Sequence, residues 1–149
     1  MNIKGVMTVL RSFLEAYENY CKPLCRELNM PQMAFDILMF LAKNPEHCTA
    51  KDISRFRGFK ENILSVNINK LVSEGYLERL SVDSDRRKVK LVCTEKAQSI
   101  IERGQKIQQE FETAIFSGLS AEEIVLCRRC LDKISENAQQ INSPRNERS

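Results

Sequence analysis

The chain has 149 residues, of which 42% are hydrophobic and 29% are charged, proportions that suit one compact domain with an apolar core. No apolar run approaches the ~20 residues that span a bilayer, and the first residues lack the charged-then-apolar pattern of a signal peptide. We therefore expect a cytoplasmic protein without a membrane segment, whose six cysteines stay reduced.

The net charge of +3 is distributed unevenly along the chain. Residues 50–90 hold ten Lys and Arg against six Asp and Glu, whereas the rest of the chain holds thirteen against fourteen. Positive charge concentrated in one third of a chain is typical of a module that contacts phosphate groups, although an ordinary solvated surface gives the same imbalance.

The first third of the chain predicts two helices. Apolar residues recur at helical spacing over residues 3–28, and Pro23 is expected to kink or break this helix because proline removes a backbone donor. A second helix is predicted over residues 31–43, where apolar side chains face nearly every direction, as in a helix buried within a fold. Its expected N-cap is Asn29, with Gln32 as the capping-box partner.

The middle third predicts a helix-turn-helix followed by a β-hairpin. A short third helix is expected to begin at the capping-box sequence of residues 49–52 and to turn at Gly58. A fourth helix, over about residues 60–74, should end at Gly75, which suits a left-handed cap. Two apolar runs flanking a charged tip then predict a hairpin over residues 76–93. A helix followed directly by a charged hairpin is typical of a winged helix-turn-helix that binds DNA.

The last third predicts two long helices. Thr94 is expected to cap the fifth helix, which Gly118 ends, and residues 120–123 form a capping box for a sixth helix that reaches Ile141. The terminal helices carry more apolar surface than the small central module needs. A second copy of the chain is the simplest partner to cover it, and a two-fold dimer would read a palindromic site.

These elements predict a mainly α fold with a small β-hairpin wing, a winged helix-turn-helix with dimerisation helices at both ends. We expect one domain over residues 1–149. Its parts are the DNA-binding module of about residues 30–94, the dimerisation helices at residues 1–28 and 95–141, and a flexible tail at residues 142–149.

The fourth helix has one face suited to DNA bases. If its apolar residues face the core, the opposite side is free to touch base edges in the major groove. Two asparagines can each offer a donor and an acceptor to adenine, an isoleucine and a valine suit thymine methyl groups, and two lysines suit phosphates. A plain polar helix surface is the alternative. The predicted DNA-binding residues of this helix are Lys60, Asn62, Ile63, Ser65, Val66, Asn69 and Lys70.

The predicted hairpin tip carries three consecutive cations, Arg86, Arg87 and Lys88, which cannot all point the same way. One arginine is expected to enter the minor groove, where narrow A·T-rich stretches strengthen the negative potential. Asp85 would repel phosphate if it were free, so we expect it to orient an arginine through a charge-assisted hydrogen bond. An exposed ion pair of little energetic value is the alternative.

Several stretches resemble the MarR family of bacterial regulators. They are Leu-Asn-Met-Pro-Gln at 28–32, Asp52-Ile53, Lys-Leu-Val-Ser-Glu-Gly-Tyr at 70–76, Asp85-Arg-Arg87 and Val92-Cys-Thr94. The Asp-x-Arg signature, seven residues before the threonine, is the specific part. The resemblance implies that Asp85 and Arg87 form the wing pair, with Arg87 in the minor groove, and that positions 62, 63 and 66 contact bases.

The resemblance also implies a homodimeric repressor that a small phenolic or hydrophobic ligand, an oxidant or a metal releases from DNA. The family's effector pocket lies between the DNA module and the dimerisation helices. The candidates to line it are Phe13, Tyr17, Phe35 and Met39, which core packing explains equally well. Three residues depart from the family pattern: Val66 replaces a frequent arginine, Cys93 a leucine and Ala97 a glycine. The first departure leaves the operator sequence open.

Two cysteine pairs keep other functions open. Cys21 with Cys25, and Cys127 with Cys130, could sense oxidants or hold a soft metal, and Cys127 with Cys130 could serve a thiol oxidoreductase. Neighbouring helical positions are ~5–6 Å apart at Cβ, which is too far for a disulfide, and buried cysteines commonly act as small apolar residues. A winged-helix module that binds only protein is a further alternative. We predict a regulator rather than an enzyme, without a cofactor or a metal.

Overall fold

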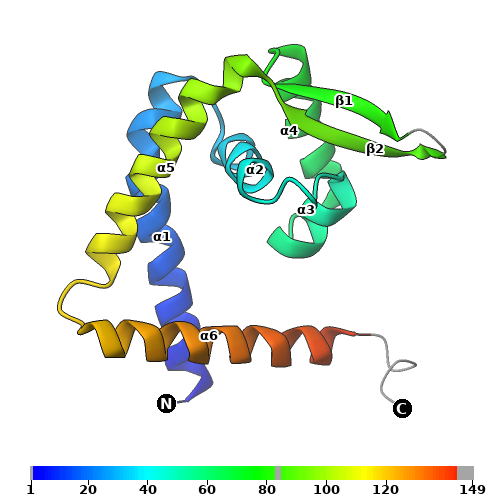
Figure 1. Cartoon of the computed structure of the whole chain (residues 1–149). Coiled ribbons are helices and arrows are strands. Elements are labelled where there is room, and N and C mark those ends of the chain that lie inside the picture. The colour runs from blue at the N-terminus through cyan, green and yellow to red at the C-terminus, as the bar shows by residue number, and fades with distance from the viewer. Residues whose placement is uncertain (1, 83–84, 144–149) are drawn as a thin grey trace. The chain divides into compact units, whose positions relative to one another are not determined.

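The computed structural model describes residues 2–82 and 85–143, except for the side chains of residues 85–87. Within these residues, six helices and one antiparallel hairpin follow in the order α1 (Ile3–Glu27), α2 (Gln32–Lys43), α3 (Ala50–Arg57), α4 (Glu61–Ser73), β1 (Leu77–Val82), β2 (Asp85–Cys93), α5 (Glu95–Ile115) and α6 (Ala121–Asn142) (Figure 1). The predicted mainly α fold with a hairpin wing is confirmed. None of the described helices is long and apolar enough to cross a membrane.

The chain forms two compact units, an N-terminal unit of Met1–Phe111 and a C-terminal unit of Glu112–Ser149. The N-terminal unit contains α1 to α4, the hairpin and most of α5. The C-terminal unit contains the end of α5 and all of α6. The interpretation of residues 1–149 as a single domain stays a prediction, and most of the expected flexible tail, residues 142–149, lies outside the described residues.

The helix α1 runs without interruption from Ile3 to Glu27 with Pro23 inside it, so the expected break is wrong, whereas the expected kink stays a prediction. A proline inside a helix leaves the carbonyl group four residues earlier, here that of Asn19, without its usual partner. Both Pro23 and Asn19 are exposed, so water can hydrate that carbonyl group and the helix continues.

Asn29 ends α1 rather than capping α2, so this prediction is also wrong. Its φ of 48° is left-handed, and the next N–H group, that of Met30, donates to the carbonyl oxygen of Cys25 at 2.9 Å. This is the hydrogen-bond pattern that closes a helix C-terminus. Pro31 then occupies the N-cap of α2. Its ring has no polar atom, so it makes no side-chain capping hydrogen bond.

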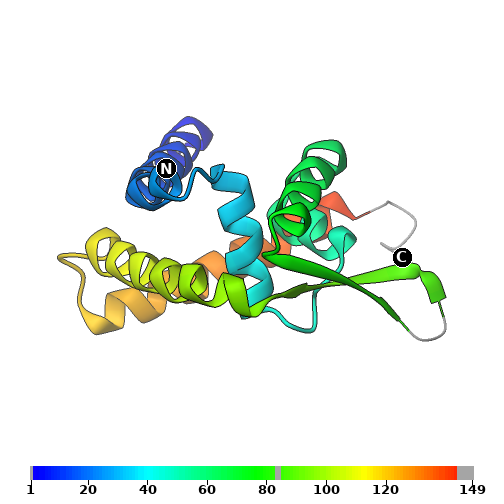
Figure 2. The ribbon, with the colours of Figure 1, turned by 90° about the horizontal axis from the view of Figure 1, so that it is seen from above.

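The helix α2 forms the centre of the N-terminal unit, between α1, α4 and α5 (Figure 2). Its buried residues are Ala34, Phe35, Ile37, Leu38, Met39 and Leu41. It approaches α5 closely at Gly104, where a Cβ atom would lie 2.5 Å from Met39 Sδ and 2.9 Å from Phe35 Cε2. The absence of a side chain at Gly104 therefore sets the spacing of the two helices.

The predicted helix-turn-helix boundaries are confirmed. Thr49 and Asp52 form a reciprocal capping box at the start of α3, and Gly58 ends this helix with a left-handed φ of 67°. The helix α4 ends before Gly75, whose φ is 82°. The Thr94 hydroxyl, which was expected to cap α5, donates to the carbonyl oxygen of Gly75 at 2.6 Å. It thereby ties the end of the hairpin to the end of α4.

The hairpin pairs Leu77 with Cys93 and Ser81 with Val89, and the register then shifts so that Val82 pairs with Asp85. The second strand begins at Asp85, so the three cations predicted at the hairpin tip, Arg86, Arg87 and Lys88, belong to β2. The shift leaves residues 86–88 of β2 between the paired residues Val89 and Asp85, so the ladder is irregular near the tip. The hairpin projects beyond the helices of its own unit (Figure 1).

The helix α6 begins with the predicted capping box between Ser120 and Glu123. Arg128 on this helix pairs with Glu112 in the same unit. None of the residues of α6 is buried in the single chain, although its apolar residues recur at helical spacing.

Candidate nucleic-acid interface

The helix α4 buries one face and exposes the other, as the sequence predicts. Leu64, Ile68 and Leu71 are at most 3% exposed and belong to the core. The residues predicted to touch bases stand on the outer side and are all exposed: Asn62, Ile63, Ser65, Val66 and Asn69. We call these five residues the outer ridge. The buried face holds the helix firmly, so the outer ridge is presented on a fixed support.

The outer ridge contains apolar side chains that have no place in the core. Val66 is 67% exposed and Ile63 is 44% exposed. Single exposed apolar residues are common on proteins, but here they alternate with amide and hydroxyl groups on one helix face. That mixture can contact both the polar edges and the methyl groups of base pairs.

The two lysines predicted to bind phosphates lie in different surroundings. Lys60 is exposed at the N-cap position of α4. Lys70 is half-buried, lies 4.0 Å from the Glu74 carboxylate and lines a concavity beside the start of α2. The structure thus separates Lys70 from the outer ridge.

The wing residues are described only in part. Lys88 is exposed on β2. The side chains of Asp85, Arg86 and Arg87 lie outside the described residues, so their predicted roles stay predictions.

Two polar contacts that support the module were not predicted. The buried Asn67 donates to the Ile63 carbonyl oxygen at 2.9 Å, and its amide nitrogen lies 3.4 Å from Met33 Sδ of α2. Arg57, at the end of α3, lies 3.4 Å from the Asp36 carboxylate of α2. Burial raises the pKa of Asp36, and the nearby Arg57 charge opposes that rise. The only sign of a buried role for Asn67 in the sequence was its position, as a polar residue, among the apolar residues of one helix face.

Hydrogen bonding also links the hairpin to the outer ridge. Arg79 of β1 donates from Nη2 to the Asn69 Oδ1 atom at 2.5 Å. Periodicity within α4 gives no signal for this contact, because Arg79 belongs to another element.

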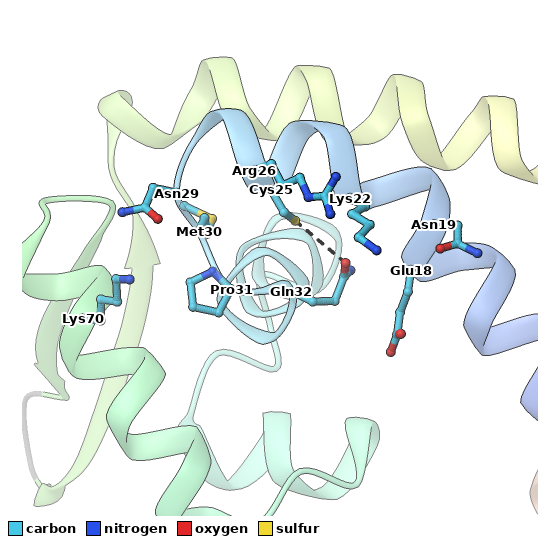
Figure 3. A pocket seen from close by; sticks show the side chains of 10 residues that line it. All are labelled: Glu18, Asn19, Lys22, Cys25, Arg26, Asn29, Met30, Pro31, Gln32 and Lys70. Carbon is cyan, nitrogen blue, oxygen red and sulfur yellow. Dashed lines mark hydrogen bonds between the residues drawn. The ribbon is translucent and has the colours of Figure 1, made fainter.

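A concavity of about 580 Å³ opens at the junction of α1 and α2, with α4 on one side (Figure 3). Three of its side chains are basic and one is acidic, and the Cys25 thiol donates to Gln32 Oε1 at 3.8 Å. Its lining residues are Glu18, Asn19, Lys22, Cys25, Arg26, Asn29, Met30, Pro31, Gln32 and Lys70.

The four residues predicted to line an effector pocket do not line this concavity. Phe35 and Met39 are at most 2% exposed and fill the core against Gly104. Phe13 and Tyr17 pack their rings 5.2 and 5.3 Å from the ring of Phe111 on α5. Tyr17 also packs against the core that contains Phe35 and Met39, whereas Phe13 is 42% exposed.

The winged-helix portion matches a known family. The model of the MarR family matches residues 28–88, from the end of α1 into β2. The resemblance to the MarR family is confirmed. Over 111 residues the chain is 22% identical to the HTH-type transcriptional regulator BilQ of Clostridium symbiosum, an alignment that covers 74% of this chain and 76% of that protein.

Solved structures share the MarR-like fold over most of the chain. A MarR transcriptional regulator from Methanosarcina mazei has a TM-score of 0.80 and 21% identity, covering 93% of this chain and 99% of that one. A putative MarR family regulator from Listeria monocytogenes, solved in complex with a 26mer DNA, has a TM-score of 0.78 and 17% identity. The structural alignment covers 92% of this chain and 88% of the Listeria monocytogenes chain. At these identities the likeness shows the fold.

Two of the three departures from the MarR pattern fall at packed positions. Ala97 is fully buried in the core, and the thiol of the half-buried Cys93 donates to the Leu38 carbonyl oxygen at 3.9 Å. Val66 alone stands on the outer ridge, so it alone changes the surface that the MarR-like module offers to DNA.

The two cysteine pairs considered as sensors differ in burial. Cys21 and Cys25 are buried, and burial raises the pKa of both thiols, that of Cys25 to about 11. A raised pKa keeps sulfur protonated and unreactive. Cys127 is half-buried and Cys130 is exposed on α6. Over the described residues, no three His, Cys, Asp or Glu side chains are grouped to hold a metal ion.

Proposed function

We propose that this chain is a transcriptional regulator that binds double-stranded DNA in a sequence-specific way. The observation that carries the proposal is the outer ridge of α4, a fixed row of amide, hydroxyl and apolar side chains beside a projecting hairpin. The ridge enters the major groove, where Asn62 and the residues after it contact base edges. Arg87 of the wing enters the neighbouring minor groove.

The supporting contacts come from cations at the edges of the ridge. Lys60 stands at the start of α4 and Lys88 on β2, and both are exposed. Each neutralises a phosphate and releases counterions, so affinity should fall steeply as salt rises. The Listeria monocytogenes protein of the same fold was solved in complex with DNA, which supports DNA binding by this chain.

The regulator acts as a homodimer. In the single chain, apolar residues of the N-terminal half of α1 and of α6 remain exposed: Ile3, Met7, Leu10, Phe13 and Leu14 on α1, and Val125, Leu126, Leu131, Ile134 and Ile141 on α6. Soluble proteins rarely leave such surface uncovered. A second copy covers it, and two-fold symmetry sets two recognition helices one turn of DNA apart, ~34–36 Å, on a palindromic operator.

Repression is released when a small effector binds, and the concavity at the start of α2 is its site. Lys22, Arg26 and Lys70 outnumber the single acid Glu18 there, so the effector is an anion. Lys70 belongs to α4, so a ligand bound there touches the recognition helix directly. Lys22→Gln should weaken release of DNA by small carboxylates without weakening DNA binding itself.

Selection from a pool of random DNA duplexes tests the DNA-binding proposal. We expect an enriched palindrome, a relaxed base preference at one position per half-site in Asn62→Ala, and an affinity lower by ~1–3 kcal/mol in Arg87→Ala. Gln140→Glu, an exposed change on α6, serves as a control. No enrichment by the wild-type chain would contradict the proposal and would favour a module that binds only protein.

The alternative of a thiol-based sensor or oxidoreductase is tested separately. Cys127→Ser with Cys130→Ser should leave DNA binding and its response to peroxide unchanged. Loss of a peroxide response in the double variant would favour the thiol alternative.

A further inference from the structure

The turn after α4 brings β1 back alongside the recognition helix. The Tyr76 N–H group donates to the Leu71 carbonyl oxygen at 2.9 Å, and the left-handed Gly75 reverses the chain direction. Leu77, the first residue of β1, is buried in the core. Because side chains on a strand alternate between two faces, Arg79 shares the core-facing side of the hairpin with Leu77. Arg79 therefore lies against α4.

In this contact it is fixed which group donates the hydrogen bond and which group accepts it. Arg79 Nη2 donates to Asn69 Oδ1 at 2.5 Å, a short charge-assisted hydrogen bond. A guanidinium group contains only donors, so it can bind only the oxygen of the amide. The opposite amide orientation would set two donors against each other. Asn69 must therefore turn its oxygen toward Arg79 and its amino group away from the hairpin.

The direction of this hydrogen bond changes which groups Asn69 can offer to a DNA base. A free asparagine offers both a donor and an acceptor, the pair that adenine matches. Here the oxygen is shared with a cation, which draws electron density from it and strengthens the N–H groups as donors. The amide on the outer ridge thus acts mainly as a donor.

We propose that Arg79 is a positioning residue that fixes Asn69 as a hydrogen-bond donor, so that one operator base is read through an acceptor atom. The inference rests on the proposed DNA-binding function. In the major groove guanine offers two acceptors and adenine and thymine one each, whereas cytosine offers an amino donor. Guanine is the preferred base at this position of the contacted strand, and cytosine is disfavoured.

Selection from random duplexes tests the proposal with a set of matched variants. Asn69→Ala locates the position, because only that base preference should disappear. Arg79→Met keeps the side-chain length but removes the donors, and Arg79→Lys keeps a charge and a donor. Lys90→Met removes another exposed cation of the hairpin and serves as the control. Thermal unfolding of each variant shows that the fold is intact.

We expect the wild-type chain to disfavour cytosine at this position by about tenfold, and Arg79→Met to reduce that discrimination to about twofold. Arg79→Lys should retain most of it, and Lys90→Met should weaken all sequences alike. Asn69→Asp keeps an acceptor for Arg79 but loses the donor, so it should favour cytosine.

An unchanged base preference in Arg79→Met would overturn this inference and leave the proposed function standing. The same holds if Arg79→Met and Lys90→Met weaken every sequence equally. If the wild-type chain enriches no sequence, the proposed function fails and this inference fails with it.

Discussion

The helices α2 and α6 carry similar apolar patterns but differ completely in burial. Six of the twelve residues of α2 are buried, whereas none of the twenty-two residues of α6 is. The helix α1 combines both cases, since Cys21, Leu24 and Cys25 are buried near its end while Leu10 and Leu14 near its start are exposed. A similar apolar pattern is therefore compatible with burial or with exposure in the single chain, and the surrounding elements decide which.

The largest expected effect concerns α6. Leu131 is 51% exposed in the single chain, and Leu131→Glu introduces a charge where the proposed dimer would bury this leucine. Losing ~1.5–3 kcal/mol of apolar burial at each of two symmetric sites should dissociate the dimer at micromolar concentration. Sedimentation velocity measures this, with the exposed Gln140→Glu as the control. A variant that stays dimeric would place the interface elsewhere.

The second prediction concerns α2. Leu38 is fully buried, so Leu38→Ala should lower the free energy of unfolding by ~2–5 kcal/mol through lost contacts and a cavity. Leu80→Ala removes the same atoms from a hairpin residue that is 47% exposed and should change the stability by less than ~0.5 kcal/mol. Urea denaturation compares the two variants. Equal losses would mean that α2 is not the centre of the core.

Buried and exposed residues should also differ in chemical reactivity, and the thiols of Cys25 and Cys130 provide the test. With its pKa raised from 9.0 to about 11, the Cys25 thiol should form about a hundredfold less thiolate near neutral pH than an unshifted thiol. We expect iodoacetamide to modify Cys130 first and Cys25 only after unfolding, as measured by mass spectrometry of peptides. Rapid modification of Cys25 in the native protein would contradict its burial.

The same shift predicts a pH dependence of stability. A pKa that is raised in the folded state contributes stability that is complete below the unfolded value of 9.0 and is lost as pH rises to about 11. The pKa of Tyr17, also raised by burial, acts in the same direction at higher pH. Cys25→Ala should flatten the alkaline loss of stability over pH 9 to 11, as thermal unfolding would show.

The smallest expected effect lies on the surface between α1 and α5. Arg103 donates two hydrogen bonds to the Glu27 carboxylate, at 2.6 and 3.0 Å, and these bonds hold the pKa of Glu27 below its ordinary value of 4.5. The stability from this pair is present above pH 4.5 and is lost as pH falls through the lowered pKa. Arg103→Ala should return the Glu27 pKa toward 4.5, as NMR titration of the carboxyl carbon would show.

Local signals in the sequence predicted most of the fold. The capping boxes at Thr49 and Ser120 were correct because each depends on residues three positions apart. Pro23 and Asn29 were misjudged because their outcome depends on exposure and on how α1 ends. A helix can continue through a proline where the unpaired carbonyl group is exposed to water, and helical periodicity in the sequence does not show that exposure.

The candidate site was predictable to the extent that it lies within one helix. The exposed and buried faces of α4 follow from helical spacing alone. The bond from Arg79 to Asn69 depends on the turn at Gly75, and the position of Lys70 depends on how α2 begins. Contacts between different elements become visible only in the folded structure, so the sequence indicated the residues proposed to contact bases but not the groups that orient them.

Gly104 has a consequence for how much this chain can vary. At most helix positions alanine replaces glycine with a gain in stability, but here even a methyl group would collide with Met39 Sδ and the Phe35 ring. A larger residue at position 104 therefore requires the Met39 side chain and the Phe35 ring to shift, or smaller residues at positions 35 and 39. Substitutions at these three positions are therefore coupled. A single larger residue at position 104 should lower the stability of the protein unless positions 35 and 39 also change.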